Sequence, residues 1–421
     1  MMSKMIFECR SGLTPRSNHT NRGIKPLLQL VIFIILNLAV SVSITFGQTT
    51  QEKLASATEK FLSELKLMQG DQTAFTPDTY YGPGGIIAVV ANGELALTRP
   101  FGYADTSDIE SLINQPADSF DSSLGNSVET NSLFRLGSTS KMFVGLALAI
   151  CKDRGLVDYD DPVSQYIDSL KNTETGKTPL KRLFTHSGGL LPLHKPGLRE
   201  RDDETTNATM EEIVAGAATM TPDESKLGSL SYSNTGVILL AEVISQVQGL
   251  AYEAFVKSEI LEPLGKKHTY FHTSEIDTQL KTTGYFPNFQ PAVDPDLQGY
   301  APVGGMYSTG PDMAKLMGLF QKALNGSEQA DLPIKAEVIQ DLTSVYLQEG
   351  PRAMGVSIDI FDREGQTMIG HNGRINGYAS FFTFSKEANL GLIFMANGGF
   401  PLGRTSAPAL MDKLLRAVGS D

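Results

Sequence analysis

Residues Met142 to Cys151 form a run of ten residues with no polar side chain except one thiol. A helix that is apolar on every side is stable only inside a protein. Lys141 stands at the head of this run, directly after Ser138-Thr139-Ser140. We therefore expect a buried central helix that draws a lysine toward the core, where a charged side chain is costly.

The hydrophobic spacing on either side of this helix changes along the chain. Residues 51–69 have the spacing of an amphipathic helix, and a hairpin with Asn92-Gly93 at its turn follows. Further helices are expected at 161–170, 210–220, 236–248, 251–265 and 308–324. Alternation of period two then predicts strands at 354–361, 367–373, 378–385 and 390–396, before a closing helix at 407–418. This order predicts an α+β fold, in which both chain ends build one sheet and a mostly helical lobe is inserted.

The first 47 residues have the composition of an export signal. Five basic residues precede the apolar stretch 27–47, which ends in small residues. Basic, apolar and small segments in that order are typical of a secretory signal. The alternative is an uncleaved anchor, because about 20 apolar residues can span a bilayer. We expect cleavage and a periplasmic or secreted protein, with membrane contact only if the segment stays attached.

The rest of the chain is acidic. Loss of residues 1–47 removes five basic residues and one acidic residue, so the formal charge changes from −12 to −16. This charge argues against nucleic acid or an anionic membrane as a partner. Cys151 is then the only cysteine, so no internal disulfide is possible. We expect residues 48–421 to form a single domain, with a sheet lobe at about 48–137 and 345–421 and a helical lobe at about 138–344.

Ser138 and Lys141 are three residues apart and share one face of a helix that starts near Gly137. The positive end of the helix dipole favours negative charge on the serine oxygen or on a bound oxyanion. Burial lowers the pKa of a lysine, so Lys141 is a candidate base for a serine nucleophile. Alternatively the serine caps the helix and the lysine extends to solvent. The same spacing at Ser63 and Lys66, on the first helix, has no expected function.

Two further triplets follow in order. Tyr232 and Asn234 belong to the only Tyr-x-Asn sequence in the chain, before an apolar helix, and His371 and Gly373 end a predicted strand. Ser-x-x-Lys, Tyr-x-Asn and His-x-Gly in this order resemble the class C β-lactamase family of penicillin-recognising serine hydrolases, which also contains D-stereospecific peptidases and lactamase-fold esterases. Seven ordered blocks between about residues 80 and 398 carry the resemblance.

The resemblance implies a β-lactamase/transpeptidase-like fold and specific roles for these residues. Ser138 is the implied nucleophile that forms an acyl-enzyme. Lys141 and Tyr232 are the implied coupled pair that takes and returns its proton. Asn234 is implied to bind Lys141 and the amide or ester region of the substrate. No cofactor is implied.

The third triplet departs from the family pattern. His371 stands where the family's lactamases have the lysine of Lys-Thr-Gly, a variant seen in its esterases and D-peptidases. Asn372 replaces the threonine of carboxylate-binding lactamases, which puts antibiotic recognition in doubt. Gly373 is retained, and the backbone N–H groups of Arg374 and Ser138 form the implied oxyanion hole.

The resemblance therefore implies an exported serine hydrolase that cleaves esters or D-amino-acid-type amides and peptides through an acyl-enzyme on Ser138. The implied partner is a small-molecule or peptide substrate. The alternative is a β-lactamase, or a penicillin-binding sensor that acylates with slow turnover.

Other segments receive secondary interpretations. Residues 105–131 are polar and acidic, and we expect them to shape the substrate rim rather than stability. His186, in His186-Ser187-Gly188, is expected to order a turn. His268 and His272 lack a nearby ligand set, so we expect no metal there.

Met306 and Tyr307 have two open interpretations. They precede a predicted helix in the sequence Gly-Gly-Met-Tyr-Ser. Lining of the cleft and packing in the core are both compatible with their sequence context.

Overall fold

The computed structural model describes residues 49–68, 82–190, 208–286, 290–326, 332–375, 377–399 and 406–419. Backbone contacts divide the chain into Met1–Glu52 and Lys53–Asp421. The described residues of the first unit, 49–52, are helical, and the helix continues to residue 64. The predicted export signal, residues 1–47, lies outside the described residues. The sheet, the other helices and the candidate site belong to the second unit.

Within the described residues, nine strands form one antiparallel sheet. In sheet order they are β3 (Gly125–Ser127), β2 (Glu94–Thr106), β1 (Gly84–Ala91), β11 (Leu390–Ala396), β10 (Tyr378–Ser385), β9 (Gln366–Ile375), β8 (Asp359–Arg363), β7 (Arg352–Met354) and β6 (Leu347–Glu349). A separate pair joins β4 (Phe134–Arg135) to β5 (Tyr307–Ser308). The prediction of one sheet built from both chain ends is confirmed.

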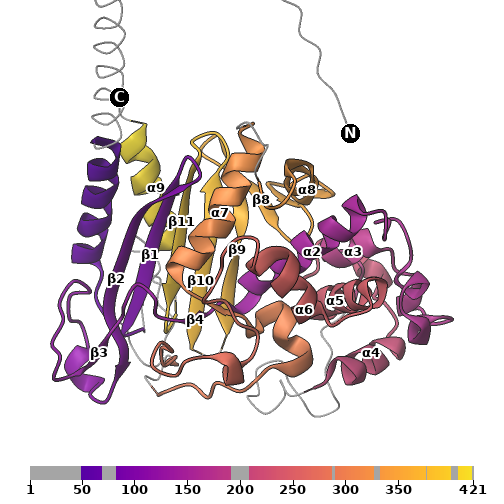
Figure 1. Ribbon diagram of the computed structural model, residues 1–421, viewed down its shortest axis with the longest axis horizontal. Helices are drawn as coiled ribbons and strands as arrows, with labels where there is room; N and C mark the ends of the chain where they lie inside the picture. The colour runs from indigo at the N-terminus through magenta and orange to yellow at the C-terminus, as the bar shows by residue number, and fades with distance from the viewer. Residues whose placement is uncertain are drawn as a thin grey trace, which may run out of the picture. The chain divides into compact units, whose positions relative to one another are not determined.

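The two faces of the sheet bury different helices. Ile86 and Val90 of β1 belong to a core that includes residues of α7 (Gly310–Leu324). Ile87 and Val89 belong to a second core, with residues of the helix ending at 64 and of α9 (Ala407–Val418). Figure 1 shows α7 and α9 beside the strands. Successive strand residues point to opposite faces, so one strand serves both cores.

The helical lobe lies between β4 and β6 in sequence. Its helices are α2 (Lys141–Asp153), α3 (Leu180–Phe184), α4 (Met210–Ala218), α5 (Asn234–Gln248), α6 (Tyr252–Val256) and α8 (Ala336–Leu342). Turns of π-helix cover Lys257–Leu261 and Ala301–Gly305. Short 3₁₀ turns lie at Glu110–Leu112, Gly137–Ser140, Val163–Gln165, Asp168–Leu170, Thr175–Lys177, Glu224–Lys226, Thr273–Glu275 and Gln298–Tyr300.

Helix α2 is the buried central helix that its sequence predicts. Every residue from Lys141 to Cys151 is buried, and the helix contacts α5 and α8. Among the described residues, no individual helix has the length and apolar character to cross a membrane. Only the bent pair Asn234–Gln248 and Tyr252–Leu261, with 77° between them, meets that test by length and composition.

Two predicted elements are wrong. The strand expected at 354–361 contains the end of β7, a turn and the start of β8, because Ser357 has a φ of +56° and interrupts the extended backbone. The helix expected at 161–170 is two 3₁₀ turns, Val163–Gln165 and Asp168–Leu170, separated by an extended Ile167. In both cases the hydrophobic spacing continues through a break in the backbone.

The acidic segment 105–131 contributes to packing, contrary to expectation. Its strand β3 extends the sheet edge beside β2, and three strands separate β2 from β9. Leu112 and Ala117 are buried in the core that contains the helix ending at 64. The ring of Phe120 lies 5.0 Å from that of Tyr103. The segment therefore contains apolar side chains that pack against the rest of the protein, although its overall composition is polar.

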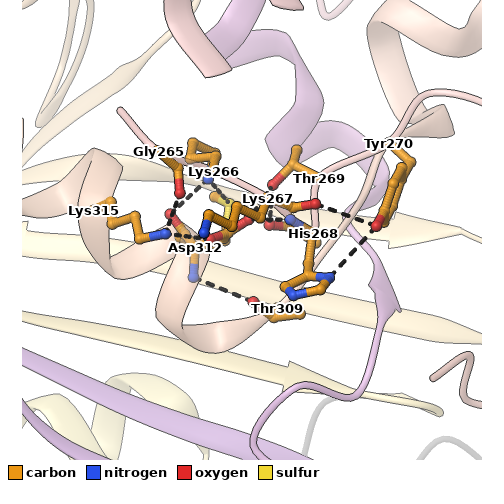
Figure 2. Close-up of polar contacts among 11 residues, drawn as sticks. Gly265, Lys266, Lys267, His268, Thr269, Tyr270, Thr309, Asp312 and Lys315 are labelled. Carbon is orange, nitrogen blue, oxygen red and sulfur yellow. Dashed lines mark hydrogen bonds and ion pairs between the residues drawn. The ribbon is translucent and has the colours of Figure 1, made fainter. Parts of the chain in front are cut away.

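A polar cluster ties the start of α7 to residues 265–270 (Figure 2). Lys266 Nζ donates to the Asp312 carbonyl at 2.6 Å. The Asp312 carboxylate accepts from Lys315 Nζ at 2.8 Å and from the His268 N–H at 2.7 Å. Thr309 caps the helix by accepting from the Asp312 N–H. Burial lowers the pKa of Lys266 to about 7.

Candidate active site

Ser138 lies in the 3₁₀ turn Gly137–Ser140, which connects β4 to α2. The α-helix itself begins at Lys141, slightly later than predicted. Ser138 is partly exposed, while its neighbours on both sides are buried. The turn therefore presents one hydroxyl to the surface from an otherwise buried segment.

The Lys141 side chain is completely buried rather than extended to solvent. Its Nζ atom donates to Ser138 Oγ and to the Val303 carbonyl, both at 2.9 Å. Val303 belongs to the π turn Ala301–Gly305. A backbone carbonyl far along the chain therefore aims the amine at the serine hydroxyl, a contact that the sequence does not reveal.

Strand β9 approaches the Ser138 turn backbone to backbone. A Cβ atom on Gly373 would lie 1.9 Å from the Leu136 carbonyl oxygen and 2.9 Å from Ser138 N. A Cβ atom on Gly137, whose φ is +52°, would lie 2.7 Å from Arg374 N. Only glycine fits at both positions. The N–H groups of the implied oxyanion hole thus belong to two segments in direct contact, although their role stays a prediction.

His371 is buried on β9 and its ring is neutral. Its Nδ1 atom lies 2.7 Å from the Asn372 carbonyl, which can only accept, so Nδ1 carries the proton. Burial lowers the pKa of His371. Asn372 and Arg374 alternate with the buried positions and are exposed.

Tyr232 and Asn234 lie at the start of α5. The Tyr232 side chain is 42% exposed, and its ring centroid lies 5.0 Å from Lys141 Nζ. Asn234 is the first residue of α5, and the Ser233 hydroxyl caps that helix by accepting from the Gly236 N–H. The three sequence triplets therefore meet around Ser138 and Lys141, and the Tyr232 side chain is exposed to solvent.

Sequence reasoning missed the place of His186. Its ring centroid lies 4.3 Å from that of Tyr232, at an angle of 36°. Its position two residues before a glycine suggested only a turn. The usable signal was its context, because a histidine inside the uncharged sequence "LFTHSGGL" is expected to be buried and then needs a hydrogen-bond partner.

Other candidate residues lie elsewhere. Met306 and Tyr307 are fully buried and pack in the core. The His272 ring pairs with Asp296 at 3.1 Å, and His268 Nδ1 lies 3.4 Å from the Tyr270 hydroxyl. In the described part of the chain, no three His, Cys, Asp or Glu residues are grouped as metal ligands.

Comparison with known proteins places the chain in a family. The family model described as Beta-lactamase matches residues 69–415. The teichoic acid D-alanine hydrolase of Staphylococcus aureus is 26% identical over 244 residues, which are 56% of this chain and 54% of that protein. The chain thus spans about half the length of the curated relatives it matches.

Two solved structures share the fold. The octameric penicillin-binding protein homologue from Pyrococcus abyssi has a TM-score of 0.67 at 22% identity, over 88% of this chain and 77% of the other. The class C β-lactamase from Rhodobacter sphaeroides has a TM-score of 0.66 at 20% identity, over 87% and 99%. At these identities the similarity shows the fold alone. Together with the family match, it shows that this chain belongs to the β-lactamase family of serine hydrolases and has the β-lactamase/transpeptidase-like fold.

Proposed function

We propose that this chain is an exported serine hydrolase that cleaves esters or D-amino-acid-type amides through an acyl-enzyme on Ser138. The observation that carries this proposal is the hydrogen bond of 2.9 Å between a completely buried Lys141 amine and the one partly exposed hydroxyl of its turn. Burial away from water favours the uncharged amine, and an uncharged amine can accept the serine proton.

The reaction would proceed in two steps, acylation of Ser138 and hydrolysis of the acyl-enzyme. Ser138 Oγ attacks the substrate carbonyl carbon and its proton passes to the Lys141–Tyr232 pair. The tetrahedral intermediate collapses, the bond to the leaving alcohol or amine breaks, and the pair returns the proton to that group. Water then attacks the acyl carbon, the pair takes its proton, and the acid leaves as the serine hydroxyl is restored.

We assign the binding of the oxyanion to two backbone N–H groups. Those of Ser138 and Arg374 lie on the turn and the strand that Gly137 and Gly373 bring together. Fixed donors on rigid segments stabilise developing negative charge without reorganisation, and removal of one such donor typically costs about 10²–10³-fold in rate. This arrangement supports acyl transfer over a purely binding role.

The third triplet favours an uncharged substrate region over a carboxylate at this position. Burial lowers the pKa of His371, so its ring is uncharged at neutral pH. Asn372 supplies no hydroxyl. A β-lactam carboxylate would therefore meet neither the cation nor the threonine of the lactamase pattern. β-Lactamase or penicillin-sensor activity remains the alternative.

D-Alanyl esters are the first substrates to test. The teichoic acid D-alanine hydrolase is similar over 56% of this chain. An ester of D-alanine also combines two substrate features that the family resemblance implies, an ester bond and a D-amino acid. Export is proposed from residues 1–47 alone, whose order of basic, apolar and small residues is that of a secretory signal.

The test is a substrate panel with mass analysis. The purified chain is incubated with p-nitrophenyl esters, D-alanyl esters, D-alanyl peptides and a penicillin, and turnover and intact mass are followed for each. We expect turnover of esters or D-alanyl compounds and little stable penicillin adduct. Turnover of the penicillin alone would favour a β-lactamase, and a stable penicillin adduct without turnover would favour a sensor.

A further inference from the structure

The loop that carries Tyr232 is held on both sides by one residue. The Ser231 N–H donates to the His186 carbonyl at 2.7 Å, and the Ser233 N–H donates to His186 Nδ1 at 3.2 Å. Ser231 and Ser233 are the chain neighbours of Tyr232. The backbone on either side of the exposed tyrosine is therefore fixed by the carbonyl and the ring of a single histidine.

The same ring also limits where the tyrosine side chain can lie. The centroids of His186 and Tyr232 are 4.3 Å apart, whereas the ring of His371 is 6.5 Å from that of Tyr232. His186 is 1% exposed, whereas the Tyr232 side chain is 42% exposed. The buried histidine ring therefore supports one side of the exposed tyrosine ring. Lys141 Nζ lies 5.0 Å from the same tyrosine ring, and movement of the ring would change that separation.

The cost of this arrangement indicates more than an ordered turn. His186 has a φ of +55°, in the left-handed region that non-glycine residues rarely adopt. Because Nδ1 accepts a hydrogen bond, the proton of the neutral ring is on Nε2. Nε2 is buried and has no hydrogen-bond partner among the described residues. Strained backbone and an unsatisfied buried donor persist where the surroundings require them.

We infer that His186 is a positioning residue for the proposed reaction, holding Tyr232 at the distance from Lys141 and Ser138 that proton transfer needs. The inference rests on the proposed function. It concerns a neutral ring, because burial lowers the pKa of His186 well below its usual value. His186 itself contacts no reacting atom.

Two variants separate the parts of this role. His186→Ala removes the ring and the Nδ1 acceptor. His186→Asn removes the ring but places an amide oxygen near the former Nδ1 position, and asparagine tolerates the left-handed backbone. The matched control is His268→Ala, which removes a partly buried histidine that contacts the Tyr270 hydroxyl.

The measurement is p-nitrophenol release in single turnover, with thermal unfolding as a folding control. A misplacement of about 1 Å can cost about 100-fold in rate, so we expect about that loss in His186→Ala with KM little changed. His186→Asn should recover part of the rate, and His268→Ala should match the parent. If His186→Ala does not fold, the comparison of His186→Asn with the parent carries the test.

A double-mutant cycle with Tyr232→Phe decides whether His186 acts through the tyrosine. In the Tyr232→Phe background, the substitutions at His186 should change the residual rate by less than about threefold, because the group they position is gone. Equal losses in both backgrounds, or a folded His186→Ala acylating within about threefold of the parent, would overturn the inference. A parent that forms no acyl-enzyme on Ser138 would instead refute the proposed function.

Discussion

The backbone of Gly373 packs directly against the Leu136 carbonyl, so that a Cβ atom there would lie 1.9 Å from the carbonyl oxygen. This contact brings β9 to the Ser138 turn. The clash would be with backbone, which cannot rotate away as a side chain can. The geometry of the site therefore requires a residue without a Cβ atom at position 373.

Gly373→Ala should separate β9 from the turn. We expect a stability loss of about 1–3 kcal/mol, as for other overpacked sites, and a larger proportional loss of acylation rate, because one proposed oxyanion donor moves. Urea unfolding and single-turnover acylation measure the two effects. Gly419→Ala is the control, since Gly419 has a φ of −89° and a Cβ atom there would have only the Leu415 carbonyl oxygen within 4 Å, at 3.3 Å. Unchanged acylation in Gly373→Ala would show that the contact does not shape the site.

Lys141→Arg tests whether the buried amine acts as a base. Arginine stays protonated in proteins and is larger and planar, so preserved charge should not preserve function. We expect a loss of acylation rate of about 10²–10⁴-fold, the usual contribution of acid–base groups. Lys66→Arg, in the other Ser-x-x-Lys sequence, should leave the rate unchanged. A folded Lys141→Arg acylating near the parent rate would exclude Lys141 as the base.

Lys266 should make stability depend on pH. Its pKa is about 7 in the folded chain and 10.5 in the reference state. Between these values the unfolded chain holds a proton that the folded chain lacks, so the unfolding free energy should rise with pH over this range. The full difference corresponds to roughly 3–6 kcal/mol as an upper limit.

Lys266→Met should remove this dependence, and the exposed Lys267→Met should retain it. Urea unfolding from pH 6.5 to pH 10 gives the comparison, as differences between each variant and the parent. Parallel profiles for the parent and Lys266→Met would show that the amine titrates as it does in water.

Leu112→Ala tests the packing of the acidic segment 105–131. Leu112 is completely buried in the core that contains the helix ending at 64, and truncation of such a residue typically costs about 2–5 kcal/mol. Ile113→Ala, at a side chain that is 37% exposed, should cost much less. Equal melting temperatures for the two variants would show that the packing of Leu112 does not contribute to stability.

The sequence predicted correctly those elements in which the periodic hydrophobic pattern begins and ends at the same residues as the regular backbone. The strands at 378–385 and 390–396 and the helix at 407–418 have the predicted bounds. The break at Ser357 was missed because a left-handed serine leaves no mark in hydrophobic spacing. That the three triplets lie together was implied by the family resemblance and not by the hydrophobic spacing.

The remaining contacts of the site come from long-range packing. Val303 and His186 meet Lys141 and Tyr232 only through the fold. A backbone carbonyl has no residue-specific sequence signal at all. His186 stands in a sequence without charged residues, which favours burial, but its spacing to glycine suggested a different role.

The most direct test of the central claim is the location of the acyl group. The parent and Ser138→Ala are mixed with a p-nitrophenyl ester, quenched during the first turnover, and analysed by intact mass and peptide mapping. The account predicts a single acyl group on the parent, in the peptide that contains Ser138, and none on Ser138→Ala. An acyl group on another residue, or equal acylation of Ser138→Ala, would contradict it.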